Sequence, residues 1–212
     1  MSKPSKELKL ASVVFLSTTI LLSMLAQMVA TPTPKKQSFQ IYILGATRKT
    51  DYYHGDESSV LLERKAKWHL GISNTMSSLQ YVVVRIRFAN ATFKTPDDAS
   101  QIPSPAPILV EFGRVLASNE TWETFFIWRI KEINVNADVI NPILLEVNGV
   151  EIRNSSVSRV STLRGRNFRI IFELWTFDQE TNSLVFGWRE GGERKTAWLQ
   201  MWFNLTTQAR TS

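Results

Sequence analysis

The pattern of apolar and polar positions divides the chain into two parts. Leu10 to Ala30 contains no charged residue, and a helix of this length covers about 30 Å, which matches the hydrocarbon core of a bilayer. From Phe39 onward, apolar and polar residues alternate with a period of two, which is typical of half-buried β-strands. The pattern predicts one transmembrane helix over residues 10–30 and a β domain over residues 39–207.

The segments around the helix complete the predicted organisation. We expect a cytoplasmic tail at 1–9, a proline-rich linker at 31–38 that ends the helix, and a C-terminal tail at 208–212. A cleaved signal peptide is the alternative, because it also begins with basic residues. The apolar region of a signal peptide is usually shorter than this one, however. A cleavage site also requires small residues in an A-x-A-like pattern, and neither Ala26 nor Ala30 ends such a pattern. We therefore favour an uncleaved signal anchor, with membrane lipid as the partner of residues 10–30.

The β domain is expected to be an antiparallel sandwich of about eight to ten short strands. Arg166–Phe177 is a long strand in this prediction, and Pro96–Pro107, which holds four prolines, is an irregular loop that resembles an insertion. Large aromatic residues on inward positions form the predicted core: Trp68, Phe88, Phe126, Trp128, Phe172 and Phe203. Aromatic burial would provide stability in a chain that has no cysteine and therefore no disulfide.

Two glycine-containing turns predict hairpins. Asn148-Gly149 between two valines is the signature of a two-residue type I′ turn, which would set Leu145 opposite Ile152. Gly191-Gly192 is expected to join a strand at Leu184–Arg189 to a partner strand at Thr196–Leu205.

The net charge of +6 belongs mainly to the flanks of the predicted helix. Residues 1–37 contain five lysines and one glutamate, a net +4, which leaves +2 for the remaining residues. A general nucleic-acid-binding function has little support from this distribution. A local basic run further along could meet lipid headgroups or acidic glycans, or it could be a solvated loop edge; it comprises Arg153, Arg159, Arg164, Arg166 and Arg169.

Four Asn-x-Ser/Thr acceptors occur after the predicted helix, at Asn90, Asn119, Asn154 and Asn204. Such acceptors are used on exported surfaces. Together with the anchor they predict a single-pass protein of the cell membrane whose glycosylated C-terminal domain lies outside. Chance occurrence in a threonine-rich β protein is the alternative.

Candidate chemistry is sparse. A metal or small-ligand site would require His54 and His69 to converge with a carboxylate such as Asp56 or Glu57, and we expect exposed surface histidines instead. No cofactor is expected. No Gly-x-Ser-x-Gly nucleophile elbow and no phosphate-binding glycine loop occurs in the sequence.

Glu173 and Asp178 are the acidic residues that a carboxylate-based glycan hydrolase could use, because they lie near one strand end. Solvated charges on an outer face are the simpler interpretation of both residues. Trp175, Trp198 and Trp202 fall on positions opposite to the inward alternation and form a candidate interaction patch. Their burial by the Pro96–Pro107 loop is the alternative.

Several short segments resemble, in order, the ectodomain of an archaeal membrane-anchored family of unknown function (domain of unknown function 1616). They are Tyr42–Gly45 with Tyr52-Tyr53, Leu70–Asn74, Trp122–Phe125 and Trp198–Thr206. The chain departs from that family at Ala46 and Tyr53, where the family has proline, and in having one predicted membrane helix rather than several. The resemblance implies an archaeal origin and an immunoglobulin-like sandwich outside the membrane, and it brings no catalytic residue with it.

These features predict a non-catalytic binding or structural module at the cell envelope, with an envelope protein or a glycan as partner. The extracellular hydrolase and the metal- or ligand-binding domain remain the alternatives.

Overall fold

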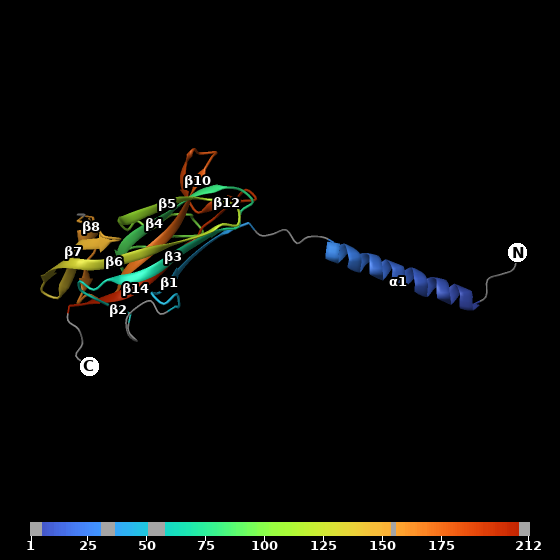
Figure 1. The fold of residues 1–212 in the computed structure, drawn as a ribbon, viewed down its shortest axis with the longest axis horizontal. Helices are drawn as coiled ribbons and strands as arrows, with labels where there is room; N and C mark the ends of the chain where they lie inside the picture. The colour runs from blue at the N-terminus through green and yellow to red at the C-terminus, as the bar shows by residue number, and fades with distance from the viewer. Residues whose placement is uncertain (1–5, 31–36, 51–57, 154–155, 208–212) are drawn as a thin grey trace. The chain divides into compact units, whose positions relative to one another are not determined.

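The computed structural model describes residues 6–30, 37–50, 58–153 and 156–207 (Figure 1). The chain divides into two compact units, residues 1–36 and residues 37–212. Most of the predicted linker and both chain ends lie outside the described residues. So do six residues considered above: Tyr52, Tyr53, His54, Asp56, Glu57 and Asn154.

The first unit contains one helix, α1 (Lys6–Ala30), which begins four residues earlier than predicted. Its hydroxyl side chains turn back onto the helix: Thr18 Oγ1 donates to the Val14 carbonyl and Thr19 Oγ1 to the Phe15 carbonyl, both at 2.8 Å. Large apolar side chains between Val14 and Leu25 are exposed. Within the described part of the chain, no helix reaches the length and apolarity required for a membrane crossing.

The second unit is an all-β sandwich of two mainly antiparallel sheets. Sheet one has the order β1 (Phe39–Leu44), β3 (Ala66–Asn74), β6 (Thr121–Asn136), β7 (Val139–Val147), β8 (Val150–Ile152), with β9 (Thr162–Leu163) also beside β7. Sheet two has the order β2 (Ser59–Leu61), β14 (Trp198–Thr206), β10 (Phe168–Asp178), β4 (Gln80–Asn90), β5 (Ile108–Leu116), with β11 (Ser183–Phe186) beside β10. Among the strands that the structure describes, the short β2 runs parallel to its neighbour β14, and an isolated bridge between Trp175 and Gly187 is also parallel. A 3₁₀ turn, η1 (Val157–Arg159), and a small hairpin of β12 (Trp188–Glu190) and β13 (Glu193–Lys195) complete the unit.

The core between the sheets is aromatic, as predicted. Trp68 and Trp128 of sheet one meet with ring centroids 5.3 Å apart, and Phe126 meets Phe172 of sheet two at 5.4 Å. All six predicted core aromatics are fully buried or nearly so. Alternation of side chains along each strand explains this result, because one parity of every long strand faces the opposite sheet.

The first predicted hairpin is confirmed and the second is wrong. β7 and β8 pair with Leu145 opposite Ile152, and Asn148 and Gly149 both have positive φ, as a type I′ turn requires. Gly191-Gly192 joins only β12 to β13. The flanking segments instead pair separately with β10: β11 with its C-terminal end and β14 with its N-terminal half. Gly187, at φ 83°, separates β11 from β12, and a Cβ there would lie 1.8 Å from the Lys195 carbonyl oxygen.

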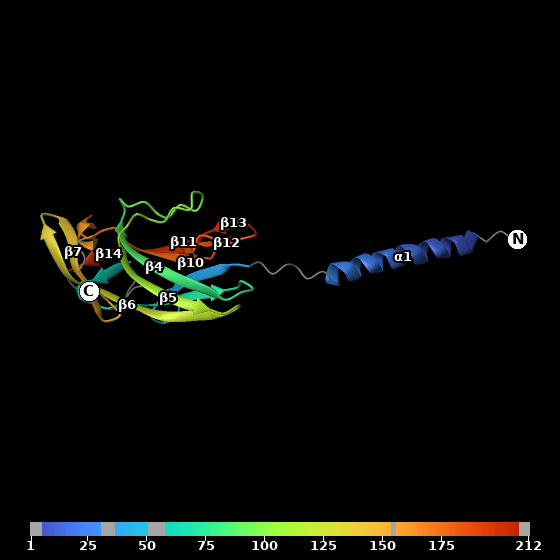
Figure 2. The same cartoon turned by 90° about the horizontal axis from the view of Figure 1, so that it is seen from above.

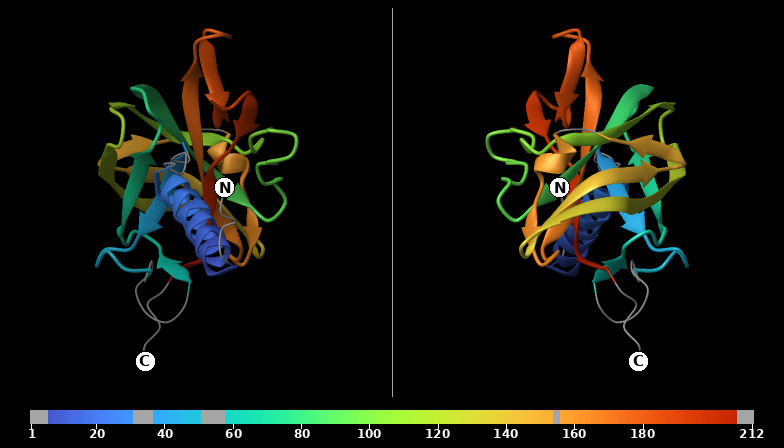
Figure 3. Two further views of the ribbon diagram at one scale, coloured as in Figure 1. Left: turned by 90° about the vertical axis from the view of Figure 1, so that its right-hand side faces the viewer. Right: turned by 90° about the vertical axis from the view of Figure 1, so that its left-hand side faces the viewer.

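Residues 91–107, here called the cover loop, connect β4 to β5 and contain the predicted irregular segment. In Figure 2 the loop, in green, stands beside the orange strands β10 and β11. Both views of Figure 3 place it on the side of the sandwich away from β1 and β3. The loop therefore faces the outer surface of sheet two.

Candidate functional site

The outer face of sheet two carries all three tryptophans of the candidate interaction patch. On β10 the odd-numbered residues face outward, and on β14 the even-numbered residues do. The register sets Glu173 opposite Trp198 and Arg169 opposite Trp202. Trp175 lies beside Val83 of β4. The structure thus brings the tryptophans onto one face, together with an acidic and a basic residue.

The cover loop divides this face into a buried part and an exposed part. Ala106 of the loop packs with Ile171 of β10, and Trp198 borders the same cluster. Asp98 of the loop accepts a hydrogen bond of 2.8 Å from Trp198 Nε1. Trp175 is buried and Trp198 is half-buried, whereas Trp202 keeps 38% of its surface exposed. Of the three tryptophans, Trp202 is the one that could serve as an open contact surface.

Glu173 is at the centre of the buried part, where sequence reasoning expected a solvated charge. Its side chain has no exposed surface, and Arg87 Nε lies 2.8 Å from Glu173 Oε2. The other carboxylate oxygen accepts the backbone N–H of Ser104 at 2.7 Å, and Trp175 Nε1 donates to Oε2 at 3.2 Å. The expectation of a solvated Glu173 is therefore wrong, because the cover loop closes over this carboxylate and supplies one of its hydrogen bonds.

Asp178 is buried as well, so the expectation of a solvated charge is also wrong here; arginine holds it on the other parity of β10. Its Oδ2 lies 3.2 Å from Arg189 Nε and 4.0 Å from an Nη of Arg194. Partial burial raises the pKa of Asp178, and hydrogen bonds from the Glu180 backbone N–H and from Arg189 more than offset this effect, so the pKa lies below its ordinary value. Five residues apart on one strand, Glu173 and Asp178 point to opposite faces, so they do not flank a common space.

Arg169 is a buried cation at the border of the exposed part. It is 3% exposed, and among the described residues no carboxylate forms an ion pair with it. Its Nη1 donates to Gln200 Oε1 at 2.9 Å, and its Nη2 donates to the Phe93 carbonyl of the cover loop. Its Nε is buried and has no hydrogen-bond partner in the described part of the chain. Burial lowers the pKa of Arg169.

The guanidinium of Arg169 lies 4.8 Å from the centroid of the exposed Trp202 ring. A cation against an indole face is a favourable arrangement, and its strength increases where water is excluded. The pair presents an exposed aromatic ring that rests on a positive charge without a carboxylate counter-charge among the described residues. This combination can bind an anionic or sugar-bearing surface through ring stacking and electrostatic attraction.

The predicted glycosylation sites have different environments. Asn90 is buried, with its side-chain nitrogen donating to the Ser161 carbonyl at 2.6 Å and its oxygen accepting from the Thr92 backbone N–H at 2.9 Å. Asn119 is exposed in the turn between β5 and β6, and Asn204 is exposed on the outward side of β14. Two of the three described acceptors are therefore accessible in the folded domain.

His69 is buried rather than exposed, contrary to expectation. Its ring lies 4.9 Å from that of Phe125 on the outer face of sheet one, where Lys67 also covers the phenylalanine. Large neighbouring side chains on the same face thus bury a residue that alternation places outward. Among the described residues, no group of three or more His, Asp or Glu side chains has an arrangement suited to a metal ion.

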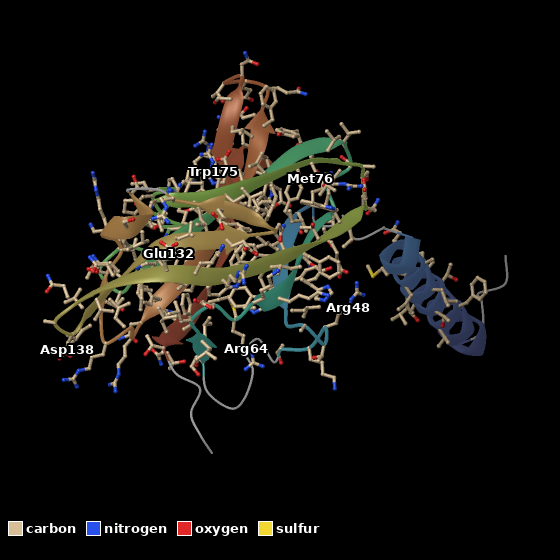
Figure 4. The ribbon with its side chains drawn as sticks, turned by 60° about the vertical axis from the view of Figure 1, so that its left-hand side comes forward. Arg48, Arg64, Met76, Glu132, Asp138 and Trp175 are labelled. Carbon is tan, nitrogen blue, oxygen red and sulfur yellow. The ribbon has the colours of Figure 1, made fainter. Side chains whose placement is uncertain are left out.

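The basic run does not form one surface. Arg153 pairs with Glu132 at 2.8 Å, and Arg164 pairs with Asp138 at 3.1 Å. Both acidic partners belong to the β6–β7 hairpin, with Asp138 at its tip (Figure 4). Arg169 lies on the outer face of sheet two instead, so the run is divided between separate parts of the domain.

Comparisons with known proteins leave the family open. No family model matches the chain, and no curated protein matches it. The CARDB domain of a Pyrococcus furiosus protein, solved in complex with di-metal ions, aligns over 84% of this chain and 95% of its own, at 10% identity and a TM-score of 0.38. A β-glucosidase from Erythrobacter marinus aligns over 80% of this chain and 16% of its own, at 9% identity and a TM-score of 0.36. A β-glucosidase from Listeria innocua aligns over 81% and 17%, at 5% identity and a TM-score of 0.34.

Sequence reasoning missed the roles of Arg87 and Arg169. A signal was present, because Ala89 and Ile171 share the outward parity with these arginines. Apolar residues on a face that should be solvated indicate that something covers it. The cover loop is the segment that does so, and the neighbouring charges had to find partners beneath it.

Proposed function

We propose that this chain is a single-pass membrane protein whose sandwich lies outside the cell and acts by binding, without catalysis, at the envelope. The observation that carries the non-catalytic part is the state of the two acidic residues. Glu173 is enclosed with Arg87, and Asp178 is held by Arg189 on the opposite face of β10. A glycosidase needs two carboxyl groups that flank one bond, and this pair does not offer that arrangement.

The anchor rests on the sequence of residues 10–30 and on the bounds of α1, although no helix within the described residues combines the length and apolarity of a membrane span. Twenty-one uncharged residues are long enough to cross a bilayer. Hydroxyl groups in a membrane helix need an internal acceptor, and Ser17, Thr18, Thr19 and Ser23 each donate to a carbonyl three or four residues earlier. The accessible acceptors Asn119 and Asn204 are compatible with an exported domain.

The topology favours an immunoglobulin-like variant of the sandwich. Taking β1, β3, β4, β5, β6, β10 and β14 as strands A, B, C, C′, E, F and G gives sheets A-B-E and G-F-C-C′. The difference is at the edge of sheet one, where β7 follows β6 in the chain instead of preceding it. Such sandwiches commonly present binding surfaces on a rigid frame.

Trp202 and Arg169 form the proposed contact surface for an envelope protein or glycan. An exposed tryptophan on a buried cation combines two residue types that dominate binding energies at interfaces. Photocrosslinking in intact cells tests this directly, with a photoreactive amino acid placed at position 202 of the full chain and, as a matched control, at the exposed Val150 of β8. We expect a discrete adduct from position 202 only. Equal labelling from both positions would contradict a dedicated surface.

The purified full chain separates this proposal from the hydrolase alternative. We expect no release of reducing ends from envelope polysaccharide. Release that is abolished by Glu173→Gln, in a variant that remains folded, would replace the binding proposal with a catalytic one.

A further inference from the structure

Four exposed apolar side chains gather at one end of the outer face of sheet two. Tyr81 of β4 is paired directly with Val115 of β5. Thr176 of β10 is paired with Val82 of β4, so Phe177, the next residue of β10, lies on the same side as Tyr81. Leu79 precedes β4 at the same end. These four residues, here called the apolar row, are 38–66% exposed. Exposed apolar side chains that lie contiguously, rather than singly, mark a contact surface.

A buried apolar cluster lies next to the apolar row on the same face. It consists of Trp175 of β10, Val83 of β4 and Phe186 of β11, with Leu184 against it. Gly113 leaves space for the tyrosine, because a Cβ there would lie 2.6 Å from Tyr81 Oη. Three of the four residues of the apolar row therefore lie on paired strands of sheet two, and Leu79 directly precedes β4.

The charges around the apolar row are neutralised within the domain. Arg85 lies against the Trp175 ring and pairs with Glu111 at 2.6 Å. Arg114 lies 3.6 Å from Glu120, and Arg189 pairs with Asp178. These paired charges offer little electrostatic attraction to a strongly charged partner. The surface suits an apolar or zwitterionic partner whose attraction depends weakly on salt.

The apolar row also lies at the end where the chain enters the sandwich. Gln37 donates from Nε2 to Ser77 Oγ at 3.1 Å, and the Ser38 backbone N–H donates to Thr75 Oγ1 at 3.0 Å. Ser77 is two residues from Leu79. The apolar row therefore lies at the same end of the sandwich as the residues that precede β1.

From these observations we propose that the apolar row docks on the zwitterionic headgroup boundary of the membrane. The proposal rests on the membrane anchoring of α1 proposed above. Leucine, valine, phenylalanine and tyrosine are suited to this boundary, because their apolar parts leave water while the tyrosine hydroxyl stays hydrated.

Spin labelling tests this proposal cleanly, because the chain contains no cysteine. The full chain is reconstituted in phosphatidylcholine vesicles with a nitroxide on Leu79→Cys or, as control, on Val150→Cys at β8, since both native residues are 66% exposed. We expect the label at position 79 to be accessible to oxygen and shielded from a water-soluble nickel complex, and the label at position 150 to show the reverse. High salt should leave both results unchanged. Equal exposure of both labels to the nickel complex overturns the proposal.

Variants and dilution distinguish docking from other causes of shielding. Tyr81→Ser with Val115→Ser should reduce the shielding at position 79 about tenfold, in proportion to the apolar area removed from the interface. Val135→Ser with Val139→Ser, on the β6–β7 hairpin, should leave it unchanged.

Shielding that disappears when the chain is diluted in lipid would identify a second copy as the partner and overturn lipid docking. If the chain does not integrate into vesicles, the anchor proposal fails, and the labelled chain added to preformed vesicles tests docking by itself.

Discussion

Arg87 Nε lies 2.8 Å from Glu173 Oε2, and this ion pair is enclosed between the outer face of sheet two and the cover loop. The same two side chains also hold the loop, because Arg87 Nη1 donates to the Ala106 carbonyl at 2.6 Å and Glu173 accepts from the Ser104 backbone N–H. The pair therefore determines which part of the tryptophan-bearing face is covered and which part stays available for binding.

Removing the negative charge of Glu173 should destabilise the domain strongly. Glu173→Gln keeps the side-chain shape but leaves the buried Arg87 without its counter-charge, and we expect a loss of about 3–5 kcal/mol in the free energy of unfolding. Denaturant unfolding of the sandwich measures this value. Asp138→Asn, in an exposed ion pair with Arg164, is the matched control and should cost at most about 1 kcal/mol.

The double variant Arg87→Met with Glu173→Leu separates charge pairing from packing. Because it removes both charges and retains apolar volume, we expect it to recover most of the stability lost by Glu173→Gln. A single variant that unfolds like the parent would show that the ion pair does not hold the cover loop.

Truncation of a core aromatic should also be costly. Phe172 is fully buried against Phe126 and Trp68, so Phe172→Ala should lower the free energy of unfolding by about 3–5 kcal/mol. Phe125→Ala, next to Phe126 but on the exposed side of β6, should cost much less. Equal losses for the two variants would contradict the inward assignment of Phe172.

The core was predictable because alternation alone assigns it. Phe172 and Phe203 fall on the inward parity of long strands, and neither depends on a distant loop for its burial. The outer face of sheet two was not predictable in the same way. Whether Glu173 meets water depends on where the cover loop lies, and contacts between distant segments, such as Ser104 with Glu173, have no local signature in the sequence. The pairing of β11 with β10 differs from the prediction because Gly187, inside the predicted strand Leu184–Arg189, has positive φ and is a break between two strands.

Acid should weaken the domain partly through Glu146. A hydrogen bond from Arg129, at 2.5 Å, holds the pKa of Glu146 below the ordinary value of 4.5, with further help from the charges of Arg129, Lys65 and Lys131. A carboxyl group with a lowered folded-state pKa contributes stability above its unfolded pKa and loses it as the pH falls through the folded value. We therefore expect the unfolding free energy to decline below about pH 4.5, and Glu146→Gln to flatten this decline. An unchanged pH profile in that variant would rule out Glu146 as a contributor.

Glycan occupancy should follow exposure. Peptide mapping of the protein from glycosylating cells should find sugar at Asn119 and Asn204 and none at Asn90, whose amide is engaged within the fold. Asn90→Gln should cost about 1–3 kcal/mol in stability, because it disturbs buried hydrogen bonds. Asn119→Gln should cost less, because Asn119 is exposed, although its φ of 60° favours asparagine over glutamine. Modification of Asn90 with the domain still folded would contradict its placement at the end of β4.

Protease accessibility in intact cells tests the anchored, external placement most directly. Cells that express the full chain are treated with protease before and after permeabilisation, and their membranes are washed with alkaline carbonate. We expect intact cells to lose the sandwich and the untreated chain to stay with the membrane after the wash. Leu22→Arg, near the middle of α1, should weaken this retention, because a central arginine costs about 2.5–3.5 kcal/mol on insertion. Digestion only after permeabilisation, or release of the unmodified chain by carbonate, would contradict the account.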